Sequence, residues 1–216
     1  VITRSLEIAS EKARGFAAEG FPDTAIRGGF ATYVGCLVTA LEVHHRTEDE
    51  VAFPELETRI PDAPYRALRR EHEALGEAVD EIGSALAALS PTGVEPAAPL
   101  EELAGAIDRA RGLWHPHIVE EERWFDAETV GTALAAHEQQ RLAQLIGKHA
   151  QEHSRPSALM LPFTLFHLEP KERAFMERSL PWFVRFVLVP VAWRSKWEPM
   201  LPFLPYGREI STENQA

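Results

Sequence analysis

The chain has 216 residues, which is enough for one domain of ordinary size, or for one domain with a substantial appendix. Its hydrophobic content of 45% and charged content of 25% are ordinary for a soluble globular protein. Acidic residues outnumber basic residues by 33 to 22, so the formal net charge is −11, which argues against non-specific binding to nucleic acid. The single cysteine, Cys36, excludes an internal disulfide. With no visible signal peptide, it leads us to expect a reducing cytoplasm.

Apolar residues recur at steps of three and four along four segments, a spacing that places them on one face of a helix. We expect helices over residues 1–18, 24–58, 64–89 and 99–127. Turn residues separate these helices, and the longest connection is a proline-rich stretch over residues 90–99. Amphipathic helices joined by short loops predict an all-α fold, an up-down-up-down four-helix bundle, which we assign to residues 1–130.

Three of these helices carry histidine or glutamate on the inward stripe, where a packing residue would otherwise lie. His44 and Glu48 are four residues apart in the second helix, and His117 and Glu121 have the same spacing in the fourth. His72 lies on the stripe of the third helix. One inward histidine is more often a hydrogen-bonded core residue than a ligand, but three helices with such residues form a much narrower pattern. Because buried imidazoles and carboxylates need compensation, we predict a metal centre in the bundle.

The residues next to two of these ligands leave alternatives open. His45 follows His44 by roughly a quarter turn, and we include it among the candidate metal ligands. The alternatives for His45 are a hydrogen bond to a ligand and an exposed position. Helical spacing favours Glu121 over its neighbour Glu122, which is the reserve ligand.

Proline and glycine interrupt the two helices that carry these pairs. Pro54 predicts a kink near residues 50–54, and Pro116 lies just before a candidate ligand, where it could aim that side chain. Gly28 and Gly29 either weaken the second helix or allow a neighbouring element to approach it closely.

After the bundle, we expect a C-terminal helical extension over residues 131–206 and a frayed tail over residues 207–216. A helix over residues 129–153 carries His149 and His153 at ligand spacing. We interpret them as part of an exposed face rather than as a second metal site, because no carboxylate shares a buried stripe with them.

Two apolar segments of the extension, residues 157–168 and 175–193, are too short and too interrupted by proline and arginine to span a membrane. We expect them to pack on the bundle, or to form a homodimer contact or a partner surface. A peripheral membrane contact is the less favoured alternative, because the chain is negatively charged.

The order of these motifs resembles the hemerythrin-like, HHE cation-binding domain family. The resemblance covers roughly residues 1–130, and the ordered set is specific although each piece alone is weak. The motifs are His44-His45-x-x-Glu48-Asp49-Glu50-x-x-Phe53-Pro54, then Glu71-His72-Glu73-x-Leu75, then His117-x-x-x-Glu121-Glu122.

This resemblance implies a non-haem centre of two iron ions, bridged by two carboxylates and by an oxo or hydroxo group. Glu48 and Glu121 are the candidate bridging carboxylates, since each has two oxygens. His44, His72 and His117 would be terminal nitrogen ligands. Iron or manganese suits such a mixed imidazole and carboxylate set, and zinc is a substitute.

The chain departs from the family pattern in its first helix, which usually supplies one histidine ligand. Residues 1–18 contain no histidine, so we expect that ligand upstream of Val1, unless the site is degraded. Leu68 and Gly76 lie one turn before and after His72, an arrangement that resembles the bacterial cation-binding branch more than the oxygen-storage branch.

Three functions fit these features. The first is a di-iron protein that binds dioxygen, peroxide or nitric oxide for sensing, carriage or the oxidative-stress response. The second is an enzyme that consumes peroxide or acts as an oxidase at the same centre, although the sequence offers no separate acid–base pair. The third is an interaction module with a vestigial metal site, whose aromatic tail binds a partner or a second copy.

Overall fold

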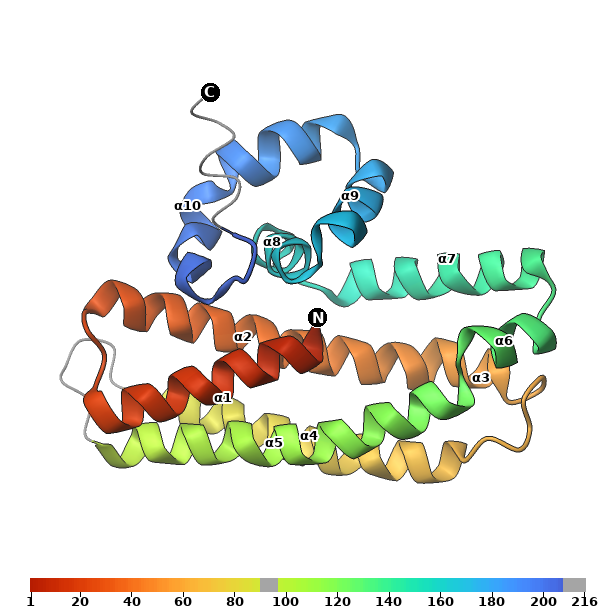
Figure 1. The fold of residues 1–216 in the computed structure, drawn as a ribbon, viewed down its shortest axis with the longest axis horizontal. Helices are drawn as coiled ribbons and strands as arrows, with labels where there is room; N and C mark the ends of the chain where they lie inside the picture. Colours follow the sequence, from red (N-terminus) through yellow and green to blue (C-terminus); the bar gives the residue numbers. More distant parts are fainter. Residues whose placement is uncertain (90–96, 208–216) are drawn as a thin grey trace.

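The computed structural model describes residues 1–89 and 97–207 of the chain. Within these residues the regular structure is helical and contains no strand, which confirms the all-α class. Figure 1 shows an elongated bundle, with the C-terminal residues gathered into a lobe along one side of it. The expected loop at residues 90–99 falls largely outside the described residues, as does most of the expected frayed tail.

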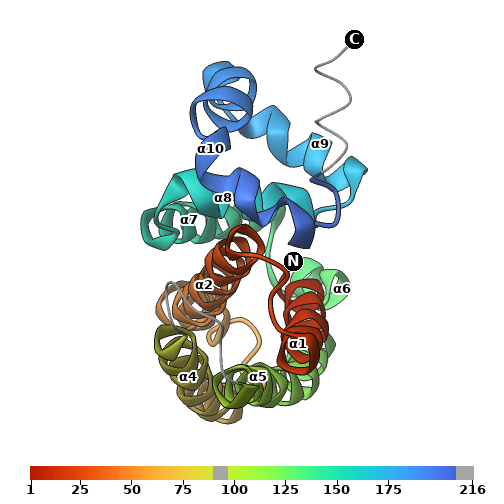
Figure 2. The ribbon, with the colours of Figure 1, turned by 90° about the vertical axis from the view of Figure 1, so that its left-hand side faces the viewer.

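Four long helices form the bundle, and each contacts the two helices that flank it. Figure 2 views the bundle from its end and shows the four helices arranged in a ring. Followed by colour in Figure 1, successive helices run in opposite directions. The bundle helices are α1 (Ile2–Glu19), α2 (Thr24–Thr47), α4 (Tyr65–Ala88) and α5 (Ala97–Trp124).

A π-helical turn, η1 (Glu48–Ala52), continues α2 into the short helix α3 (Phe53–Leu56). The backbone N–H of Phe53 donates to the carbonyl of Glu48, five residues earlier. Pro54 has no N–H to offer the preceding turn, so a regular α-helical hydrogen-bond pattern cannot continue through it. The structure therefore has a π turn where a proline kink was expected, and such turns are frequent at functional sites.

The bundle interior contains two apolar clusters with a polar layer between them. Helix α2 contributes Leu41 to the larger cluster, while Phe53 from α3 belongs to the smaller one. Helix α4 contributes Leu75 to the larger cluster and Leu68 to the smaller. The candidate ligands predicted from the sequence lie between these apolar positions on each helix.

One helical stretch, Thr24–Leu56, is long and apolar enough to cross a membrane by length and composition alone. The core helix of a helical bundle passes the same test, and this stretch carries buried residues of both apolar clusters.

The chain after the bundle departs from the expected helix boundaries. Helix α5 ends at Trp124 rather than at residue 127, and the single helix expected over residues 129–153 is two helices, α6 (Ala127–Ala133) and α7 (Ala136–His153). The carboxylate of Asp126 accepts the N–H of Thr129 and so begins α6 just after the end of α5.

The helices of the lobe follow a cis peptide bond between Arg155 and Pro156. The first helix of the lobe matches the apolar segment expected over residues 157–168. The apolar segment expected over residues 175–193 is divided near Pro181 between two elements. These elements are α8 (Ser157–His167), α9 (Pro170–Ser179), the π-helical η2 (Val184–Ala192), α10 (Arg194–Trp197) and the 3₁₀-helical η3 (Glu198–Phe203).

The lobe packs on the bundle along α2. Elements α8 and η3 contact α2, and Phe163 and Phe203 join the larger apolar cluster. A β-carbon at Gly29 would clash with the backbone carbonyl of Pro199, so glycine at this position is what lets η3 approach α2 closely. Of the two roles considered for this glycine, the structure supports the close approach.

Candidate metal centre

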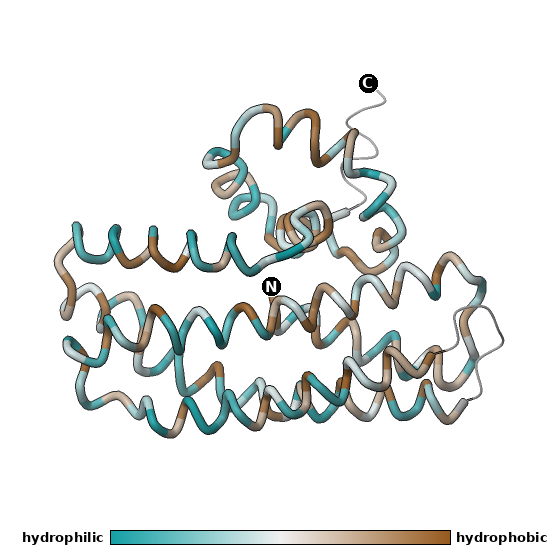
Figure 3. Tube along the Cα trace, turned by 180° about the vertical axis from the view of Figure 1, so that it is seen from behind, coloured by the Kyte–Doolittle hydropathy of each residue, from teal (hydrophilic) through white to brown (hydrophobic). Residues whose placement is uncertain are grey.

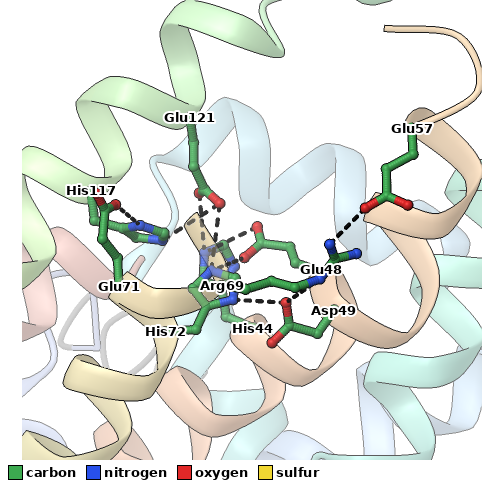
Figure 4. A network of polar contacts seen from close by, with 9 residues as sticks. All are labelled: His44, Glu48, Asp49, Glu57, Arg69, Glu71, His72, His117 and Glu121. Carbon is green, nitrogen blue, oxygen red and sulfur yellow. Dashed lines mark hydrogen bonds and ion pairs between the residues drawn. The ribbon is translucent and has the colours of Figure 1, made fainter. Parts of the chain in front are cut away.

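The six predicted ligands lie together in the polar layer, contributed by α2, η1, α4 and α5. Figure 4 shows five of them converging, with α4 and α5 facing the end of α2. Ligand atoms of His44, Glu48, His117 and Glu121 lie within 4.8 Å of one another, as do those of His44, His45 and His117. His72 belongs to neither group, but its Nε2 faces the carboxylates of Glu48 and Glu121. We call all six residues the His/Glu cluster: His44, His45, Glu48, His72, His117 and Glu121.

The two predicted pairs at a spacing of four point to the same place. Nε2 of His44 lies 3.2 Å from Oε1 of Glu48, and Nε2 of His117 lies 3.5 Å from Oε1 of Glu121. The pairs also meet each other, since Nε2 of His44 is 3.8 Å from Oε2 of Glu121. The third helix completes the cluster, because Nε2 of His72 lies 3.4 Å from Oε2 of Glu48 and 3.7 Å from Oε1 of Glu121.

The inward-facing atoms of this cluster are buried but make no hydrogen bonds. Native proteins satisfy nearly all buried polar groups, so several unsatisfied atoms at one point need an explanation. A cation among them would satisfy them together, and imidazole nitrogen with carboxylate oxygen is a ligand set that suits iron, manganese or zinc. The atoms concerned are Nε2 of His44, His45, His72 and His117, Oε2 of Glu48 and Oε1 of Glu121.

Two carboxylates lie behind the imidazoles, on the side away from the cluster. Nδ1 of His117 donates to Oε2 of Glu71 at 3.0 Å, and a carboxylate hydrogen-bonded at Nδ1 holds the proton there and leaves Nε2 free to bind a metal. Oδ1 of Asp49 lies 3.0 Å from Nδ1 of His72, an ion-pair distance without hydrogen-bond geometry. Figure 4 shows Arg69 between Asp49 and Glu57, at 3.8 Å and 2.6 Å, so Asp49 is itself held in place.

These two carboxylates were not among the predicted site residues. Both belong to the motifs that carry the family resemblance, directly beside Glu48 and His72. Residues adjacent in a helix do not face the same way, so Asp49 points away from Glu48, and Glu71 from His72. Each of them instead contacts a histidine of an adjacent helix, which a single sequence does not reveal.

The electrostatics of the cluster favour an added positive charge. Burial lowers the pKa of His72, but contacts with Glu121, Glu48 and Asp49 outweigh burial and raise that pKa to about 10. Burial raises the pKa of Glu121, but His44 and His72 lower it to about 2. The raised pKa of His72 and the lowered pKa of Glu121 both indicate that the carboxylates of this site are ionised and that positive charge is stabilised there.

His45 differs from the other histidines of the cluster. Burial lowers its pKa to about 2, with further lowering by the adjacent histidines, so its imidazole stays neutral and can act as a ligand. Its ring stacks on that of His72 with 4.5 Å between ring centroids. The exposed alternative for His45 is therefore wrong, because its side chain is buried.

Aromatic rings enclose the cluster on two sides. The ring of Trp114 lies 5.1 Å from that of His44, and the ring of Phe53 stacks on His72 at 5.5 Å. The indole N–H of Trp114 donates to Oγ1 of Thr3 at 2.9 Å, so the first turn of α1 lies next to this wall of the site. The expected ligand upstream of Val1 stays a prediction.

His149 and His153 do not form an exposed face, contrary to expectation. Nδ1 of His149 lies 3.0 Å from Oγ1 of Thr47, and its Nε2 lies 3.0 Å from Oε2 of Glu50. His153 bonds to the carbonyl of His149, and both rings are partly buried. Their role is to hold α7 against α2 and η1, a tertiary contact that the spacing on α7 does not encode.

The helical bundle and its His/Glu cluster define a cation-binding protein built on three helices of a four-helix bundle. The model of the hemerythrin HHE cation-binding domain family matches residues 5–127, which is more than half of the chain. The chain therefore belongs to this family, and the resemblance found in the sequence is confirmed. A comparison with curated proteins and another with solved structures each found no significant match.

Proposed function

We propose that this chain is a non-haem di-iron protein that binds dioxygen, peroxide or nitric oxide, and that it serves in sensing, carriage or the oxidative-stress response. One observation carries the proposal. Six ligand atoms, four imidazole nitrogens and two carboxylate oxygens, are buried together without hydrogen bonds. The net charge of −11 and the reducing cytoplasm inferred from the single cysteine agree with this role.

The directions of the carboxylate oxygens support two metal ions rather than one. Glu48 presents Oε1 to His44 and Oε2 to His72. Glu121 presents Oε2 to His44 and Oε1 to His72 and His117. A carboxylate whose two oxygens face different nitrogen ligands could serve two ions, so Glu48 and Glu121 would be shared ligands and His44, His72 and His117 terminal ligands, with His45 a further candidate.

Iron bound by these residues would supply a redox-active Lewis acid with coordination positions open to a small ligand. The protein residues around it have separate tasks. Asp49 and Glu71 orient His72 and His117 through their Nδ1 atoms. Phe53 and Trp114 form apolar walls that exclude water beside the ligands.

Metal analysis tests this proposal directly. Protein produced with iron should contain about two iron ions per chain and show a charge-transfer absorption that depends on oxygen. Glu121→Ala should lose most of the iron, whereas Glu122→Ala should retain it, because Glu122 is exposed although it is adjacent in sequence. Absence of any transition metal from the unaltered protein would refute the proposal.

The same preparations separate binding from catalysis. A binding protein should react with hydrogen peroxide only in proportion to its iron content. Sustained consumption of peroxide that disappears in Glu48→Ala would instead assign the enzymatic function. An enzyme of this kind would be expected to have an acid–base pair near the cluster. Among the described residues, the two nearby carboxylates, Asp49 and Glu71, are each paired with an imidazole instead.

A further inference from the structure

The large apolar side chains exposed on the described part of the chain are concentrated in one segment of the lobe. Among them, Phe175 is 75% exposed, Trp182 70%, Phe186 60% and Val191 68%. Every tryptophan or phenylalanine in that exposed set lies between residues 175 and 186. We call this segment the aromatic face. Its members are Phe175, Trp182, Phe183, Phe186, Val187 and Val191.

Five of the six members of the aromatic face lie in the segment between α9 and α10, and Phe175 lies on α9 itself. Figure 1 shows the chain between α9 and α10 at the outer edge of the molecule, and Figure 3 shows hydrophobic residues along that edge. Exposed aromatic side chains that gather in one place usually mark a surface that another molecule covers.

The charge of this segment is opposite to that of the whole chain. Residues 175–198 contain four basic and two acidic residues, a formal charge of +2, whereas the chain has a net charge of −11. Two of the basic side chains are paired with those acids, Arg185 with Glu177 at 3.2 Å and Arg194 with Glu198 at 3.1 Å. The four basic residues are Arg178, Arg185, Arg194 and Lys196. The negative charge that disfavours membrane contact for the chain as a whole therefore does not apply to this segment.

The cations lie directly beside the aromatic rings. The guanidinium of Arg178 is 6.0 Å from the centre of the Phe175 ring, and that of Arg185 is 4.9 Å from the centre of the Phe186 ring. Arg185 also forms an ion pair of 3.2 Å with Glu177 on α9, which ties η2 to α9. Two rings of the aromatic face thus each have a guanidinium beside them, and one of these guanidinium groups is also paired with a carboxylate.

We propose that the aromatic face binds the surface of an anionic lipid bilayer. Tryptophan and phenylalanine favour the boundary between headgroups and acyl chains, and arginine and lysine favour anionic headgroups. The segment is too short to span a bilayer, so it lies in the interface while the bundle and its metal centre stay outside.

A second copy of the chain fits this surface less well. A two-fold contact between aromatic faces would place Arg178 and Arg185 of one copy near the same residues of the other. The cores of protein interfaces are depleted of charge, and like charges that face each other are unfavourable. An anionic lipid surface instead satisfies the cations and the aromatic rings together.

Co-sedimentation with lipid vesicles tests the proposal on the intact chain. We expect binding to vesicles of phosphatidylcholine and phosphatidylglycerol in equal parts, weak binding to phosphatidylcholine alone, and weaker binding at high salt. The double variant Trp182→Ser/Phe186→Ser should bind the anionic vesicles about tenfold more weakly or worse. Each of Arg178→Gln and Lys196→Gln should weaken binding about fivefold.

The control is Leu113→Ser/Val119→Ser, which removes two exposed apolar side chains from α5 of the bundle and should leave vesicle binding unchanged. Iron content and circular dichroism should be unchanged in all variants, which separates this test from that of the metal centre. Failure to bind anionic vesicles, or equal loss in the control, would overturn the proposal. A concentration-dependent dimer that dissociates in Trp182→Ser/Phe186→Ser, without vesicle binding, would assign the face to a second copy.

Discussion

Nδ1 of His72 lies 3.0 Å from Oδ1 of Asp49, while Nε2 of the same ring faces the carboxylates of Glu48 and Glu121. The imidazole is therefore held between a carboxylate outside the cluster and two carboxylates within it. Because Asp49 and His72 belong to different helices, this contact also links the π turn after α2 to α4. The outer carboxylate orients the ring and increases its basicity as a ligand.

We predict that Asp49→Ala weakens metal binding about 10- to 100-fold, because His72 loses the carboxylate that lies 3.0 Å from its Nδ1. Titration of the protein against a chelator of known affinity measures this change. Glu73→Ala is the matched control, since Glu73 is exposed although it adjoins His72. Equal metal affinity in the two variants would show that Asp49 has no part in ligand orientation.

Removal of metal should destabilise the fold. Without a cation, the carboxylates of Glu48 and Glu121 and the unsatisfied imidazole nitrogens remain buried together. A metal at about 100 to 1,000 times its dissociation constant stabilises the folded state by roughly 3–4 kcal/mol. We expect the melting temperature to fall on chelation and to rise with added metal, as thermal denaturation would measure. A His44→Ala variant should respond far less, and an equal response would contradict this prediction.

The ligands of the cluster could be predicted from the sequence because they obey the period of a single helix. His44 and Glu48 share one face of the second helix, His117 and Glu121 share one face of the fourth, and the apolar residues on the same stripes indicate which face is inward. A buried layer of imidazole and carboxylate then has few compensations other than a cation. The four-helix bundle followed from the same periodicity.

The parts that were missed depend on contacts between helices. Glu71 bonds to His117 and His149 bonds to Thr47, and each pair joins residues at least 46 positions apart. The π turn was missed because Pro54 predicts some disruption of the helix but does not select its form. Periodicity within one helix contains no information about these features.

The close packing of η3 on α2 predicts a specific intolerance at Gly29. A β-carbon there would clash with the backbone carbonyl of Pro199, which cannot move as a side chain could. We expect Gly29→Ala to lower the free energy of unfolding by roughly 1–3 kcal/mol, as overpacking does. Gly35 provides the control in the same helix, because nothing lies within 4 Å of a β-carbon there.

Gly35→Ala should raise the free energy of unfolding by about 0.5–1 kcal/mol, because alanine favours the helix. Urea denaturation of the two variants measures both effects. The opposite signs separate the clash from the general effect of a glycine-to-alanine change. If both variants are stabilised, η3 does not lie against Gly29.

His149 predicts a local effect on α7. Its two ring nitrogens contact Thr47 and Glu50, so His149→Ala removes these two polar contacts between α7 and the ligand helix. Hydrogen exchange of the α7 amides should become several-fold faster, while exchange in α1 should not change. His137→Ala is the control, because His137 is an exposed histidine of the same helix. Unchanged exchange in α7 would mean that other contacts hold this helix.

His167 predicts how stability depends on pH. Its Nδ1–H donates to the carbonyl of Phe163 at 2.7 Å, and its Nε2 lies 2.9 Å from the hydroxyl of Tyr33, which also lies 3.3 Å from the carbonyl of Ser5. Burial lowers its pKa to about 4, and the bond to Phe163 offsets only part of that effect. Burial raises the pKa of Tyr33, so the phenol stays protonated throughout the acidic range.

An unfolded histidine has a pKa of about 6.5, so between pH 6.5 and 4 the unfolded chain binds a proton that the folded chain does not. Above pH 6.5, His167 therefore does not make the stability depend on pH. As the pH falls from 6.5 to 4, protonation of His167 in the unfolded chain lowers the free energy of unfolding by up to roughly 3 kcal/mol. Denaturant titrations of metal-free protein should show a shallower fall for His167→Gln than for the unaltered chain. His137→Gln, at an exposed site, should keep the full slope. Parallel slopes for all three proteins would mean that His167 is protonated in the folded state, which its burial opposes.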